Sequence, residues 1–176
     1  MGSRDKCSFG QSAHCTRCGK ADKCQLKKIL CDTNVISAAF LEEKEQDIAM
    51  TFLENHRQKH LIVITKEILG EIIGVLLTKS GNDQLALDNI TKFLSHLKDF
   101  IVESPPYSEE EFREVLNKIW DSKELRCGYA DRIHIANAIF SKIKFCTLEE
   151  KIREDAKTVN DIVSEEGYKF ELYNLH

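Results

Sequence analysis

Four acidic residues stand at positions from which their carboxylates could share one site. Asp32 directly follows a short apolar run, and Glu149 lies three residues beyond another. Glu71 falls on the border of the apolar face of an amphipathic segment, and Asp131 lies on the apolar stripe of the segment 129–141. Gathered carboxylates repel unless a cation neutralises them, and hard oxygen ligands select Mg²⁺ or Mn²⁺.

The chemistry expected of such a cluster is phosphodiester hydrolysis. Two divalent ions roughly 3.5–4 Å apart can generate a hydroxide, hold the phosphate and stabilise the leaving oxygen in an in-line displacement. The sequence shows no competing cofactor motif, because no glycine-rich turn follows the first apolar run and no P-loop lysine is present.

Each acid also has a purely structural explanation. Asp32 could cap a helix, and Glu71 could reach from its border position to water. Asp131 and Glu149 stand near predicted helix starts, where the helix dipole favours a negative charge. Glu150 is assigned to a helix cap alone. Taken together, these structural explanations are weaker than a shared metal site, because four carboxylates at one sheet edge would repel one another without a cation.

The elements that must position these acids follow from the hydrophobic pattern. Strands of a few residues alternating with helices predict a three-layer α/β/α fold with a parallel central sheet covered on both faces. Ligands bind outside the carboxyl ends of such strands, so Asp32 and Glu149 are expected at one edge. We predict strands at 28–31, 61–64, 100–102, 143–146 and 168–173, and helices at 34–41, 65–77, 83–97, 108–123, 129–141 and 147–166. A further, polar helix with Ile48, Phe52 and Leu53 facing inward is predicted to end near Lys59.

Local signals refine these elements. Thr65 is predicted to be an N-cap, and two capping boxes are expected, Ser108 with Glu111 and Thr147 with Glu150. The helix 129–141 is expected to be the most buried in the domain, because its apolar residues cover most of its circumference. Trp120 is predicted to be in the core, whereas His60, His96 and His134 are predicted to be surface or hydrogen-bonded histidines rather than ligands.

Composition bounds the remaining possibilities. The 176 residues, 42% hydrophobic and 31% charged, suit one globular domain with a small appendage. No apolar run approaches the roughly 18 residues of a membrane span, and no signal-peptide pattern opens the sequence, so a cytoplasmic location is the default expectation. Three of the seven cysteines, Cys31, Cys127 and Cys146, lie in apolar segments and are expected to be buried.

The other four cysteines predict a metal site in an N-terminal arm, residues 1–27, preceding the domain 28–176. Cys7, Cys15, Cys18 and Cys24 would suit tetrahedral Zn²⁺, with His14 able to replace Cys15. An iron–sulfur cluster and an unligated tail remain alternatives. The segment contains too few apolar residues to fold by burial alone, so a metal would be needed to order it.

Charge is unevenly distributed along the chain. Residues 1–28 carry a net charge of +5, which leaves −9 on the rest of a chain whose total is −4. Arg17, Lys20 and Lys23 could contact RNA phosphates, although a solvated basic face around a stabilising metal explains them equally well.

The residues in their order along the chain resemble the PIN domain family of metal-dependent nucleases. The resemblance covers roughly residues 28–155. It is carried by Ile29-Leu-Cys-Asp-Thr-Asn-Val35, Thr65-Lys-Glu-Ile-Leu-Gly-Glu71, Tyr129-Ala-Asp-Arg-Ile-His-Ile-Ala-Asn-Ala138 and Cys146-Thr-Leu-Glu149. The resemblance implies that Asp32, Glu71, Asp131 and Glu149 hold one or two Mg²⁺ or Mn²⁺, supported by Asn34 and Thr147. Glu149 departs from the family, which more often has Asp there.

The resemblance implies a ribonuclease, specifically an endonuclease, acting on single-stranded RNA. Family members act as toxins, as ribosomal RNA processing nucleases or as noncatalytic scaffolds, so an antitoxin or ribosomal partner and a homodimer are further expectations. The main alternative is a noncatalytic RNA-binding module that works through its cysteine-rich arm. A phosphotransfer fold is disfavoured, because a dehalogenase-like enzyme would need Asp at position 34, where the sequence has Asn34.

Overall fold

The computed structural model describes residues 26–41, 44–56 and 59–175 of the chain. Its central sheet is parallel and follows the strand order β3-β2-β1-β4. Because runs such as Ile62-Val-Ile64 are apolar and β-branched, they suit a strand covered on both faces. The strands are β1 (Lys27–Cys31), β2 (His60–Thr65), β3 (Ile101–Glu103) and β4 (Lys144–Cys146).

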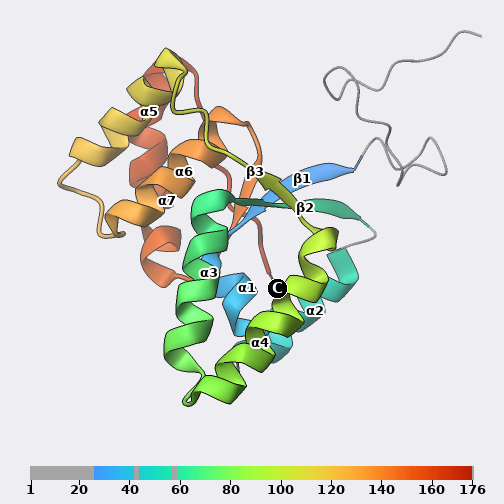
Figure 1. Ribbon diagram of the computed structural model, residues 1–176. Helices are drawn as coiled ribbons and strands as arrows, with labels where there is room; N and C mark the ends of the chain where they lie inside the picture. The colour runs from blue at the N-terminus through green and yellow to red at the C-terminus, as the bar shows by residue number, and fades with distance from the viewer. Residues whose placement is uncertain (1–25, 42–43, 57–58, 176) are drawn as a thin grey trace, which may run out of the picture.

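Helices cover both faces of this sheet, so the predicted three-layer fold is confirmed. Figure 1 shows α5, α6 and α7 together on one side and α1 to α4 on the other. Within the described residues, no helix is long and apolar enough to cross a membrane. The helices are α1 (Thr33–Ala38), α2 (Gln46–His56), α3 (Lys66–Lys79), α4 (Asp83–His96), α5 (Glu110–Asp121), α6 (Tyr129–Phe140) and α7 (Glu150–Val163), with short 3₁₀ turns η2 (Leu97–Asp99) and η3 (Ser164–Glu166).

The core lies on both sides of β1. Leu30 is fully buried between its register partners Val63 on β2 and Phe145 on β4. In α6 every residue from 134 to 139 is buried, as the all-round apolar pattern predicts. Cys31, Cys127 and Cys146 are buried free thiols, also as predicted.

Several local predictions need correction. Thr65 does cap α3, since its hydroxyl accepts a hydrogen bond from the Ile68 amide. The two predicted capping boxes are wrong, because α5 and α7 begin after Glu109 and Glu149, and neither makes a side-chain cap bond. The segment 168–173 forms an isolated bridge at Leu172 to Phe145 instead of a strand. Trp120 is 39% exposed, so its predicted core position is also wrong.

The connection between α5 and α6 is fixed by two buried charged residues. The Arg132 guanidinium donates to the carbonyls of Ile119, Trp120, Ser122 and Leu125. Asp155 on α7 accepts hydrogen bonds from two consecutive amides just before α6, those of Arg126 and Cys127. Because each buried charge is hydrogen-bonded to several backbone groups, Arg132 and Asp155 together fix the position at which α6 begins.

Candidate active site

Asp32 lies at the carboxyl end of the central strand β1 and caps α1. Its Oδ1 accepts from the Thr33 amide at 2.8 Å. Its Oδ2 accepts from the Thr147 hydroxyl at 2.7 Å and from the Asn34 amide at 2.8 Å. The side chain is only 3% exposed, and burial raises the pKa of Asp32 to about 6 although the hydrogen bond from Thr147 lowers it. The three hydrogen bonds therefore fix the orientation of the Asp32 carboxylate, although burial disfavours its charged form.

Asn34 and Thr147 join the ends of β1 and β4. The Asn34 Oδ1 accepts from the Leu148 amide at 2.9 Å, and its Nδ2 also lies 3.2 Å from the Thr147 hydroxyl. That hydroxyl accepts from the Glu149 amide while it donates to Asp32. The contacts explain why Thr147 forms no capping box, because its oxygen is already engaged at the sheet edge.

Glu71 reaches the same edge from α3. Its Oε2 accepts from the Thr33 hydroxyl at 2.6 Å and lies 3.3 Å from the His134 Nε2. The hydrogen bond with His134 holds the pKa of Glu71 below its ordinary value, against a smaller opposing effect of burial. Because both contacts use Oε2, neither involves the second carboxylate oxygen, Oε1.

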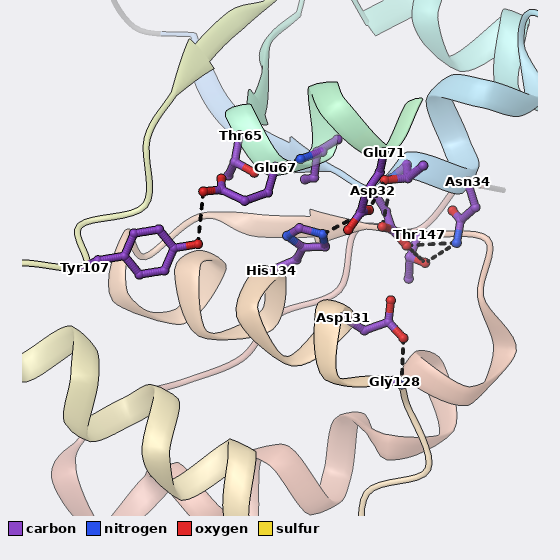
Figure 2. Close-up of polar contacts among 12 residues, drawn as sticks. Asp32, Asn34, Thr65, Glu67, Glu71, Tyr107, Gly128, Asp131, His134 and Thr147 are labelled. Atoms are coloured by element: carbon purple, nitrogen blue, oxygen red, sulfur yellow. Dashed lines mark hydrogen bonds and ion pairs between the residues drawn. The ribbon is translucent and has the colours of Figure 1, made fainter. Parts of the chain in front are cut away.

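Asp131 projects from the first turn of α6. Its Oδ2 accepts from the Gly128 amide at 2.8 Å, and Figure 2 shows its other oxygen directed toward Thr147. Burial raises the pKa of Asp131, and the negative charges of Glu149 and Glu71 raise it further. The sequence predicts that Asp131 lies on the apolar stripe of its helix. In the structure Asp131 is half-buried, at the end of that stripe that faces the site.

Glu149 stands just before α7, in the turn that Thr147 and Asn34 hold. It is half-buried, and its charge acts on Asp131. Asp131 in turn raises the pKa of Asp32. The structure thus brings Asp32, Glu71, Asp131 and Glu149 to one sheet edge, within the range at which each affects another's ionisation.

Two residues of this site were missed by the sequence analysis. Thr33 falls between two residues already chosen, Asp32 and Asn34, and nothing in its type marks it. His134 was predicted to be a surface or hydrogen-bonded histidine, and it is hydrogen-bonded, since its Nε2 contacts Glu71. What the sequence did not indicate is that His134 is 1% exposed at the site and that its Nδ1 has no hydrogen-bond partner among the described residues. The signal was its spacing, since His134 lies one helical turn after Asp131 on the most buried helix.

The donor set fits a hard divalent cation in type. All four acids offer carboxylate oxygens, and the raised pKa values of Asp32 and Asp131 are what a nearby cation would relieve. Within the described part of the chain, no three His, Cys, Asp or Glu side chains stand in an arrangement that would hold a metal ion.

Comparison with known proteins decides the family. The family model of the PIN domain matches residues 29–157. The chain belongs to the PIN domain family. This match spans the elements that carry all four acids, from β1 into α7, so the PIN domain includes the whole candidate site. No curated protein sequence matches the chain significantly.

Several solved structures resemble this PIN domain, and two of them illustrate the likeness. One is a chain of VapBC2 from Rickettsia felis, solved bound to a DNA fragment from the promoter, at 18% identity and a TM-score of 0.56 over 72% of this chain and 92% of that chain. The other is VapC20 from Mycobacterium tuberculosis, described as a sarcin-ricin loop cleaving toxin, at 16% identity and a TM-score of 0.51 over 66% of this chain and 85% of that chain. At these identities the likeness concerns the fold.

The predicted N-terminal metal site lies outside the described residues. Cys7, Cys15, Cys18 and Cys24 all precede residue 26, and so do Arg17, Lys20 and Lys23. The zinc site, the RNA contacts of the arm and the division at residue 27 stay predictions from sequence.

Proposed function

We propose that this PIN domain is a Mg²⁺- or Mn²⁺-dependent ribonuclease that cleaves single-stranded RNA internally. The observation that carries the proposal is the meeting of Asp32, Glu71 and Asp131 at the carboxyl end of the central strand, from three separate elements. A structural role needs no such convergence, because each acid could satisfy its own helix locally. Glu149 completes the set from a fourth element.

Asp32, Glu71, Asp131 and Glu149 would hold the ion or ions. A divalent ion bound there supplies an activated water and offsets the charge that develops on phosphate. The protein's own part is orientation. Asn34 and Thr147 fix Asp32 on one oxygen, and Thr33 with His134 fixes Glu71 on one oxygen. Holding the carboxylates before substrate arrives reduces the reorganisation needed for reaction.

The choice of RNA as substrate rests on the family resemblance and on one structural relative. VapC20 is described as cleaving the sarcin-ricin loop, which is RNA. VapBC2 was solved as an assembly on promoter DNA. We extend to this chain the RNA substrate and, as a further proposal, an antitoxin partner.

We also propose that Cys7, Cys15, Cys18 and Cys24 bind Zn²⁺, with an iron–sulfur cluster as the competing outcome. The support is the cluster of thiols in a segment too polar to fold by burial. Metal analysis of the purified chain distinguishes these possibilities, since an iron–sulfur cluster absorbs visible light and zinc does not.

Cleavage of a pool of single-stranded RNAs in Mn²⁺ tests the ribonuclease proposal. Wild type is expected to cut internally, and Asp131→Asn to lose cleavage while its circular dichroism spectrum stays unchanged. The mutant is a better control than a chelator, which would also strip the cysteine site. Cleavage retained in Asp131→Asn would reject the assignment. Binding without cleavage by either protein would favour the noncatalytic RNA-binding module.

A further inference from the structure

Lysines gather at the edge of the sheet opposite the candidate active site. The parallel strands begin there, and three adjacent strands each begin at or beside a lysine: Lys27 opens β1, Lys59 precedes β2 and Lys144 opens β4. Figure 1 shows the starts of β1 and β2 together at this edge. The body of the protein is acidic overall, so a local cluster of cations is unexpected there.

A pocket of about 300 Å³ extends this cluster beyond β4. Its lining includes Lys142, Lys144 and Lys169 together with Tyr168. Glu171 lies among them, 2.6 Å from the Lys169 ammonium and 3.8 Å from that of Lys144. Lys144 and Lys169 remain 50% and 73% exposed, so one carboxylate does not cover the cations. We call Lys27, Lys59, Lys142, Lys144 and Lys169 the basic edge.

Two observations indicate that the basic edge is a single electropositive surface. The pKa of His60 at the start of β2 is lowered by burial and then by the charges of Lys59, Lys27 and Lys144. The pKa of Glu171, which lies in the pocket, is likewise held below its ordinary value by the hydrogen bond and charge of Lys169 and then by the charges of Lys144 and Lys27.

We propose that the basic edge binds the phosphate backbone of single-stranded RNA at a distance from the bond that is cut. This proposal rests on the ribonuclease function proposed above. A five-residue strand spans about 16 Å, so a strand of RNA must extend several nucleotides from the active-site edge to reach these lysines. Contacts to phosphates alone add affinity without selecting sequence.

RNA is favoured over an acidic protein segment by the form of the surface. The lysines belong to several separate elements, all five are exposed, and three of them line the pocket, which suits a flexible chain carrying a charge at every phosphate. The proposal therefore predicts a dependence on RNA length. RNA too short to span the sheet is bound at the active-site edge only.

Salt-dependent binding tests the proposal in the full chain carrying Asp131→Asn, so that RNA stays intact. The test variant adds Lys142→Gln, Lys144→Gln and Lys169→Gln, and a matched control removes three charges elsewhere through Lys79→Gln, Lys92→Gln and Lys157→Gln. For RNA of about 30 nucleotides, the test variant is expected to lower the slope of log affinity against log salt by about 2, since each phosphate contact contributes about 0.7. RNA of about six nucleotides is expected to bind both variants equally.

A third protein, carrying Lys142→Arg, Lys144→Arg and Lys169→Arg, controls for folding by keeping the charge. It is expected to bind long RNA as the parent does. Equal salt slopes in the test and control variants would overturn the basic edge while leaving ribonuclease function intact. The opposite outcome is also distinguishable. If the wild-type protein cuts no RNA but the test variant still has a lower salt slope than the control variant, the basic edge stands and the ribonuclease proposal fails.

Discussion

At the scale of single residues, the site is defined by how Asp32 is buried. The carboxylate is 3% exposed and accepts three hydrogen bonds, yet its pKa is raised to about 6 from an ordinary value of 3.8. Desolvation therefore outweighs the stabilisation of the charge by its donors. A bound cation would reverse this balance by adding the missing opposite charge.

This burial predicts a pH-dependent stability in metal-free buffer. Because the folded state binds the Asp32 proton more tightly than the unfolded state, the free energy of unfolding falls as pH rises from about 4 to about 6 and stays lower above that. Asp32→Asn removes this dependence. Relative to wild type, its free energy of unfolding is expected to improve by about 2 kcal/mol between pH 4 and pH 7.5. Urea denaturation at both pH values measures it, and parallel pH profiles would contradict it.

The Thr33 hydroxyl is predicted to orient Glu71. It donates to Oε2 at 2.6 Å, so its removal frees the carboxylate to rotate. Thr33→Val, which keeps the shape, is expected to weaken Mn²⁺ binding by roughly tenfold, the size typical for residues that orient metal ligands. Thr33→Ser keeps the hydroxyl and should restore binding. Isothermal titration measures both, and equal affinities for the Val and Ser variants would exclude an orienting role.

At the scale of elements, periodicity predicts the fold because it depends on many residues at once. The short apolar segments at 61–64 and 143–146 predict β2 and β4 to within a residue, and the all-round apolar pattern identifies α6 as buried. The ends of elements depend on single contacts, which sequence does not display. Thr147 looks like the first residue of a capping box, but its hydroxyl instead bonds Asp32, 115 residues away.

In the candidate site, too, some residues could be predicted from the sequence and others could not. The acids could be predicted, because each follows a strand or interrupts an apolar stripe. Thr33 could not, since its role comes from a contact with Glu71, 38 residues away. The spacing of His134 could place it near Asp131, but not its contact with Glu71, 63 residues away. The exposure of Trp120 also depends on a contact that the sequence does not show. Its ring packs against the ring of Tyr129 at the surface, with centroids 4.6 Å apart.

The turn between β4 and α7 allows a matched comparison of two neighbouring glutamates. Glu149 is half-buried and acts on Asp131, whereas Glu150 is exposed in the first turn of α7. Glu149→Gln is therefore expected to lower Mn²⁺-dependent cleavage by at least tenfold, the scale of losing a metal-binding group, while Glu150→Gln leaves it unchanged. Initial cleavage rates measure the difference. Equal effects of the two changes would remove Glu149 from the site.

At the scale of the whole molecule, charge is divided between a basic start and an acidic body. The segment 1–24 contains too few apolar residues to contribute to a hydrophobic core by burial. Deleting residues 1–24 is expected to leave the melting temperature of the PIN domain nearly unchanged and to weaken RNA binding more at low salt than at high salt. Fluorescence anisotropy over a salt series measures it, and an unchanged salt slope would contradict a phosphate-binding arm.

The most direct test of the central claim is Mn²⁺ binding followed by electron paramagnetic resonance, in which the signal of free Mn²⁺ falls as the ion binds. The claim is that the acids at the end of β1 bind a divalent cation. Wild type is expected to bind Mn²⁺ saturably, Asp32→Asn to bind at least about tenfold more weakly, and Asp161→Asn, which changes an exposed acid on α7, to bind as wild type does. Equal Mn²⁺ affinity in Asp32→Asn and wild type would contradict the claim.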